Sequence, residues 1–387
     1  MSEYQYYEFV AIDEPLTPQQ MTELRARSSR ASITPTSFVN DYQWGNLKGD
    51  PADWMRRYFD AHVYVANWCT CLLYLRVPKS AFDAETLRAF KTKTVFSVEQ
   101  TKTHWLLEWG LDESDNDDRF AEEDGRGWMG RLAPLRDELL RGDMRPLYLG
   151  WLAGVSAGEV DEKAIEPQPP PGLSRLTAAQ QALAEFLEVD VDLLAAAGLS
   201  DRQGSKPDSE SNAERDVWIA ALPAAEKTAM LKLLLTGNAQ QAERKLKLRF
   251  LAWQREQQPI EKPGTRRTVA ELQKLAASAA EARKRQEAVR RKKAEAERQA
   301  KRETYLRTLA ADFDRCWQAV DKLAERGIAS AYDEVKRALV DLSDAYALCA
   351  ARADFDQKLV QFMVRHGKRG ALVRRLADAG LWKKSSR

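Results

Sequence analysis

The pattern of apolar and polar positions predicts a mixed α/β first half and a helical second half. Up to residue 109, short aromatic and β-branched segments, which predict strands, alternate with two amphipathic segments, which predict helices. These two segments begin directly after Thr17 and Asp50. Their order, β-α-β-β-α-β with further strands after it, is typical of a ferredoxin-like α+β domain. Residues 128–155 then have a helical pattern with breaks at Pro134 and Pro146.

A long segment without proline or glycine runs from Thr268 to Arg326. Thr268 and Glu271 have capping-box spacing, and Gly327 stands where a helix ends on a left-handed residue. We therefore expect one continuous helix from Thr268 to Arg326. Its second half has apolar residues at steps of three and four, as do the segments that follow it: Leu306, Leu309, Phe313, Cys316, Val320, Leu323; Tyr332, Val335, Leu339, Leu342, Tyr346, Cys349; Phe355, Leu359, Phe362, Met363; Leu372, Leu376, Leu381.

Together these patterns predict an α+β fold with several domains. We expect an N-terminal ferredoxin-like mixed domain, followed by mainly α-helical domains with one long charged helix and a C-terminal helical bundle. Two proline-containing stretches mark linkers. The expected divisions are an α+β domain (1–158), a Pro-rich linker (159–175), a helical domain (176–258), a linker with the charged helix (259–303) and the C-terminal bundle (304–387).

The composition is typical of a soluble protein with sizeable hydrophobic cores. Of its 387 residues 44% are hydrophobic, and the net charge is only +2. The sequence has no apolar run of about 18 residues, so we expect no membrane partner. The N-terminus lacks the pattern of a signal peptide, and four scattered cysteines do not form a disulfide framework. These features predict a cytoplasmic protein.

The first half of the long helix concentrates positive charge. Between Glu281 and Glu303 it has ten Lys and Arg against five Glu. Three interpretations remain open: a solvated helical spacer, an arm that contacts nucleic acid, and a helix that pairs in a coiled coil. The candidate nucleic-acid-binding residues are Arg283, Lys284, Arg285, Arg290, Arg291, Lys292, Lys293, Arg298, Lys301 and Arg302.

Motifs for catalysis or metal binding are incomplete. Cys69 and Cys71 would face the same side of a strand, but a zinc site needs four ligands and the chain offers no second pair. The acidic segment 112–124 lacks the glycine and terminal glutamate of a calcium loop, and residues 333–336 hold only a fragment of a nuclease motif, on a predicted helix. We expect no metal, no cofactor and no catalytic residue. One polar cluster could line a pocket, although helix caps explain most of it: Asn40, Asp41, Asp50, Asp53, Asp60 and His62.

Two parts of the sequence resemble known groups of proteins. The segments YQYYEFVAID, SFVNDYQWG, KGDPADWMRRYFDAHVYVANW and LYLGWLAGV resemble an uncharacterised group of bacterial proteins. The tail HGKRGALVRRLADAGLW is similar to the C-terminal helices of bacterial SWIM zinc-finger proteins. The SWIM zinc motif is only half present at Cys69-Thr-Cys71, so no zinc role carries over. The resemblance implies a bacterial protein associated with nucleic-acid machinery.

These observations favour a non-catalytic protein over an enzyme. We expect an interaction or scaffold subunit of a bacterial nucleic-acid-associated system, with one or more protein partners. One alternative is a direct nucleic-acid-binding protein that uses the basic helix. The other is a nuclease-like enzyme with its site in the N-terminal domain.

Overall fold

The chain divides into two compact units. The computed structural model describes residues 4–112, 125–199, 212–237 and 267–382, with scattered positions between 239 and 253. The units are Met1–Ala282 and Arg283–Arg387. The Pro-rich segment 159–175, which we expected to separate two domains, lies within the first unit. Most of the acidic segment, residues 113–124, lies outside the described residues.

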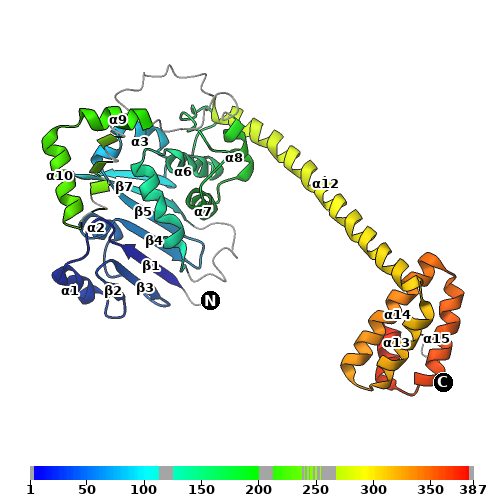
Figure 1. Cartoon of the computed structure of the whole chain (residues 1–387). Helices are drawn as coiled ribbons and strands as arrows, with labels where there is room; N and C mark the ends of the chain where they lie inside the picture. Colours follow the sequence, from blue (N-terminus) through cyan, green and yellow to red (C-terminus); the bar gives the residue numbers. More distant parts are fainter. Residues whose placement is uncertain are drawn as a thin grey trace. The chain divides into compact units, whose positions relative to one another are not determined.

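A seven-stranded antiparallel sheet forms the centre of the first unit (Figure 1). The α+β class is thus confirmed, but the ferredoxin-like topology is not. Every described pairing is antiparallel, and β5, β7 and β6 continue the sheet beyond β4. The strand order is β2-β3-β1-β4-β5-β7-β6, with β1 Gln5–Val10, β2 Ser32–Thr34, β3 Ser37–Tyr42, β4 Ala61–Ala66, β5 Cys71–Pro78, β6 Phe96–Gln100 and β7 His104–Leu111.

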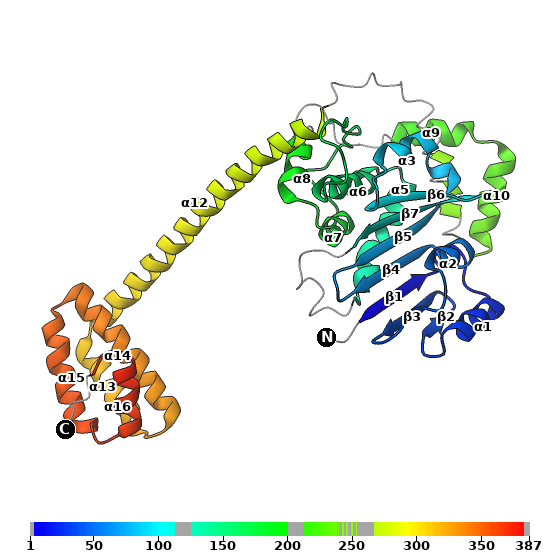
Figure 2. The ribbon, with the colours of Figure 1, turned by 180° about the vertical axis from the view of Figure 1, so that it is seen from behind.

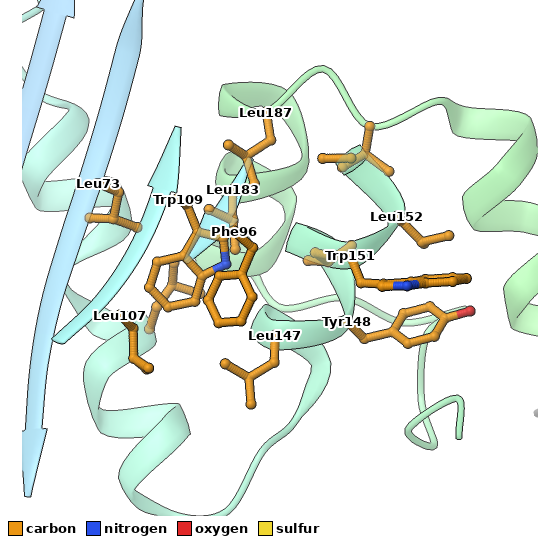
Figure 3. Close-up of a cluster of buried hydrophobic side chains, with 14 of the residues drawn as sticks. Leu73, Phe96, Leu107, Trp109, Leu147, Tyr148, Trp151, Leu152, Leu183 and Leu187 are labelled. Atoms are coloured by element: carbon orange, nitrogen blue, oxygen red, sulfur yellow. The ribbon is translucent and has the colours of Figure 1, made fainter. Parts of the chain in front are cut away.

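The larger core lies between one face of the sheet and a layer of helices. Alternate residues of β5, from Cys71 to Val77, are buried there, as expected for a strand with one covered face. In this core the ring of Trp109 lies 5.0 Å from that of Phe96, and Tyr148 lies 5.6 Å from Trp151 (Figure 3). The covering helices are α3 Ala84–Phe90, α4 Trp128–Leu132, α5 Pro134–Leu140, α6 Arg145–Ser156, α7 Ala178–Phe186 and α8 Val191–Ala197, with the 3-10 turn η1 Lys79–Ala81 before α3.

The opposite face of the sheet is covered by α1 (Pro18–Arg27) and α2 (Pro51–Arg57); in Figure 2, α1 lies beside β2, and α2 lies near the ends of β1 and β4. Both helix starts are confirmed. Thr17 forms the expected capping box, and Asp50 accepts a hydrogen bond from the amide of Ala52 at 3.0 Å. Trp54 of α2 then packs against Phe9 and Phe38 of the sheet.

The helix α12 (Val269–Ala310) begins inside the core of the first unit. Its capping box is confirmed, since the amide of Thr268 donates to Glu271 at 2.7 Å and the amide of Glu271 donates to Thr268 at 3.3 Å. Just before it, Arg267 and the Tyr148 hydroxyl both donate to the buried carboxylate of Glu166. Burial raises the pKa of Tyr148 well above its ordinary value, so this hydroxyl remains a donor. Val269 and Leu272 are fully buried, which fixes the first turn of α12 to the core.

The predicted continuous helix is wrong at residues 311–312. α12 ends at Ala310, and α13 (Phe313–Glu325) begins after a turn. Asp312 lies at the break and is the N-cap of α13: it has φ −151° and its side chain accepts a hydrogen bond from the amide of Arg315 at 2.9 Å. A short acidic side chain can thus start a new helix where neither proline nor glycine marks a boundary.

We expect Asp312→Ala to destabilise the first turn of α13 by about 1 kcal/mol, because the substitution removes the cap. Hydrogen exchange at the Arg315 amide measures this loss. The exposed substitution Gln318→Ala on the same helix is the control. Equal exchange at Arg315 in the two variants would show that Asp312 is not a stabilising cap.

The second unit contains the predicted helical bundle. Its helices α13, α14 (Ala329–Cys349), α15 (Arg352–His366) and α16 (Gly370–Asp378) share one apolar core. Gly327 has φ +71°, the left-handed conformation expected after α13. Most of the predicted apolar positions are buried, but Phe313 is half-buried and Cys349 is exposed. Trp317, which was not among the predicted positions, is buried as well.

Outside these cores lie α9 (Asn212–Ala221) and α10 (Ala224–Leu235). Trp218 of α9 is buried, and its ring lies 5.2 Å from that of Phe250. Across the described helices, no segment is both long and apolar enough to cross a membrane.

Candidate nucleic-acid interface

The structure places all ten candidate nucleic-acid-binding residues on α12. From Glu281 to Lys301 every side chain is exposed, including Val289 at 67% exposure. Alanine, glutamate, glutamine, lysine and arginine dominate this stretch, and all of them favour helix intrinsically. The helix here therefore depends on its own backbone and on local charge pairs, and its side chains are accessible to a partner.

Arg302 and Arg283, two of the ten, form ion pairs within the chain. Arg302 pairs with two acids of α14, Asp341 at 2.6 Å and Asp344 at 2.8 Å. Arg283 pairs with Glu287 at 3.2 Å. Arg302 therefore contributes to docking α12 on the bundle and is less available to an external ligand than the others.

A further group of the ten has no ion pair with any acidic residue that the structure describes: Lys284, Arg290, Arg291, Lys292, Lys293, Arg298 and Lys301. Exposed cations without an acidic partner can neutralise the phosphates of a polyanion. The counterions condensed on the polyanion are then released, and their release favours binding.

Charge is divided unequally between the two units. The second unit has 26 Lys and Arg against 15 Asp and Glu, a net charge of +11. The first unit has 34 against 43, a net charge of −9. The chain's overall charge of +2 conceals this division, which becomes visible only when the boundary between the units is known.

The polar cluster predicted in the first unit consists of residues with separate structural roles. Asn40 donates to Ser28 at 3.1 Å, Asp50 caps α2, and Asp53 lies 3.5 Å from Arg57. His62 is fully buried, with its ring stacked on that of Phe9 at 3.7 Å. Burial lowers the pKa of His62 to about 3, so the ring is neutral near pH 7.

Asp60 belongs to a buried ion network that sequence reasoning missed. It accepts hydrogen bonds from the amides of Ile12 and Asp13 and from Arg76 at 2.8 Å, and Arg136 lies 3.8 Å away. Burial alone would raise the pKa of Asp60, but the two guanidinium groups hold it below its ordinary value. The partners are distant in sequence, so no local pattern indicated the network.

The two neighbouring cysteines do not share a strand as expected. Cys69 lies in the turn between β4 and β5 with φ +66°, and Cys71 is the first residue of β5. The thiol of Cys71 donates to the Phe186 carbonyl at 3.1 Å. The described residues include no group of His, Cys, Asp and Glu that could hold a metal ion. The nuclease-like fragment lies on α14, where Asp333 pairs with Arg375 at 2.7 Å.

Comparison with known proteins adds no relative: no protein-family model, curated protein or solved structure matches the chain significantly. Among the residues that the structure describes, the basic part of α12 is the feature that best indicates a function.

Proposed function

We propose that the protein is a non-catalytic interaction subunit of a bacterial nucleic-acid-associated system, whose second unit contacts nucleic acid. The separation of charge between the units is the main support: +11 on Arg283–Arg387 against −9 on Met1–Ala282. Phosphate backbones attract such a positively charged unit, and the released counterions contribute to affinity. The exposed cations of α12 are the contact that we propose.

A role as a scaffold also requires a protein partner, and exposed apolar residues support one. They lie on α9 and α10, two consecutive helices of the first unit. Exposed apolar residues that occur together are typical of protein–protein interaction surfaces. These residues are Val217, Ile219, Leu231, Leu234 and Leu235.

We expect the full chain to bind nucleic acid at low salt and to lose affinity steeply as salt rises. Replacing Arg290, Arg291, Lys292 and Lys293 by glutamine should weaken binding for all sequences alike and flatten the dependence of log affinity on log salt concentration. The reason is that each phosphate which the protein no longer neutralises removes about 0.9 from that slope. Fluorescence anisotropy with labelled oligonucleotides measures both quantities.

The control replaces four exposed cations of the first unit by glutamine: Arg27, Lys48, Arg57 and Lys102. It lowers net charge equally but should leave the slope unchanged. Absence of binding at low salt would contradict the proposal and leave α12 as a spacer. Cleavage of the oligonucleotide would instead favour the enzyme alternative.

A further inference from the structure

The cations of α12 are unevenly distributed around the helix. At about 100° per residue, seven of the ten fall within about 120° of the circumference, and only one of the five glutamates, Glu287, falls there with them. The remaining circumference has three cations, Arg285, Lys292 and Lys293, against four glutamates. One side of the helix is therefore strongly positive, and the other is close to neutral.

Five of these seven residues form what we call the basic face: Lys284, Arg290, Arg291, Arg298 and Lys301. The other two, Arg283 and Arg302, already pair with Glu287, Asp341 and Asp344. All five are exposed, and none has an ion pair with an acid that the structure describes.

The basic face runs lengthwise along α12. Lys284, Arg291 and Arg298 follow one another every seven residues, which is about 10 Å per step, and the whole face spans about 26 Å. Seven residues fall about 20° short of two turns, so the row stays nearly straight over this length.

We infer that the basic face binds the phosphate backbone of a duplex nucleic acid, side-on and without regard to sequence. This inference depends on the proposed function and adds both the contacting residues and the class of nucleic acid. Duplex DNA carries one negative charge per about 1.7 Å of its axis, so a straight cationic row meets phosphates along its full length.

The composition of α12 favours a duplex over a single strand. Proteins that bind single strands without sequence preference stack the bases on aromatic side chains. Residues 269–304 contain no aromatic residue, and the first is Tyr305. A membrane surface fits poorly, because a helix that lies on lipid needs an apolar side, whereas the side opposite the basic face is charged.

Two variants of the full chain, each lacking three cations, test the orientation. The face variant combines Lys284→Gln, Arg291→Gln and Arg298→Gln, and the matched control combines Arg285→Gln, Lys292→Gln and Lys293→Gln. Anisotropy is measured with a labelled duplex of random sequence, with a single strand of the same length, and with poly-glutamate, over a range of salt concentrations. Circular dichroism checks that each variant keeps its helix content.

We expect the face variant to bind the duplex about tenfold or more weakly and to lose up to about 2.7 from its log–log salt slope, because three phosphates are no longer neutralised. The control should lose less affinity and less of the salt slope than the face variant, because its three cations lie outside the basic face. The natural sequence should bind the duplex more tightly than the single strand or poly-glutamate.

Equal losses in the two variants would overturn the oriented face while leaving nucleic-acid binding intact. Tighter binding of the single strand would overturn the duplex preference, and equal binding of poly-glutamate would indicate an acidic protein as the ligand. If the natural sequence binds no nucleic acid even at low salt, the proposed function fails together with this inference.

Discussion

Phe362→Ala is expected to lower the free energy of unfolding of the second unit by about 3–5 kcal/mol. Phe362 of α15 is fully buried, and its ring lies 6.1 Å from that of Trp317 on α13. Removing the ring leaves a cavity between helices that the surrounding backbone can only partly fill. Hydrogen exchange of the α14 amides in the full chain reports the stability of this unit separately from that of the first.

Val364→Ala on the same helix is the matched control, because Val364 is 81% exposed and its truncation should change stability by less than about 0.5 kcal/mol. Phe313→Ala should fall between the two. Its ring stacks on Tyr346 at 3.8 Å but is only half-buried, so its truncation removes less apolar packing. A loss below about 1 kcal/mol for Phe362→Ala would mean that α15 does not pack as described.

Acid is expected to destabilise the first unit through His62. The folded-state pKa of about 3 lies below the ordinary value of 6.5, so between these values the unfolded chain binds a proton that the folded chain excludes. The stability that His62 provides is therefore complete above about pH 6.5 and is lost as pH falls toward 3. Each pH unit in this window should cost about 1.4 kcal/mol.

His62→Phe should remove this dependence, because phenylalanine can keep the ring stack on Phe9 but has no proton to gain. The free energy of unfolding, obtained from denaturant titrations between pH 7 and 4.5, is the measurement. His104→Gln is the comparison, since burial also lowers the pKa of the half-buried His104. Asp60 does not interfere, because its lowered pKa places its loss of charge at more acidic pH. An unchanged slope in His62→Phe would show that another group causes the acid sensitivity.

Local chemistry made much of the fold predictable. The helix starts at Thr17, Asp50 and Thr268 all form as expected, because a cap involves only a side chain and amides two or three residues away. Strand positions followed in the same way from β-prone segments that end at turns. The full order of the seven strands did not follow, because β5, β7 and β6 extend the sheet beyond β4 through contacts that the local pattern does not encode.

The periodicity of apolar residues was not sufficient to predict which face of α13 is buried. Phe313, Cys316, Val320 and Leu323 have the spacing of a buried row, but the residues most deeply buried on α13 are Trp317, Val320 and Ala324. The two rows have the same period and lie side by side on the helix. The cap at Asp312 begins a new helix there, so the apolar row of α12 no longer determines which side of α13 faces the core.

The candidate site was predictable in its residues but not in their roles. The ten basic positions follow from composition, and their angular distribution follows from the helical period. The pairing of Arg302 with Asp341 and Asp344 could not be predicted, because it depends on how α14 packs beside α12. The charge division between the units required the boundary at Ala282 and Arg283.

The contacts that Arg267 and Thr268 make with the core of the first unit affect which changes of chain length this protein can tolerate in evolution. Arg267 donates a hydrogen bond to the Ala196 carbonyl at 3.2 Å, and Thr268 pairs with Ile165. Ala196 and Arg267 are thus in direct contact although 71 positions separate them along the chain. Doubling the length of such a loop costs only about 0.6 kcal/mol in closure entropy. We therefore expect insertions and deletions between Ala196 and Arg267 to leave the sheet and the start of α12 as they are.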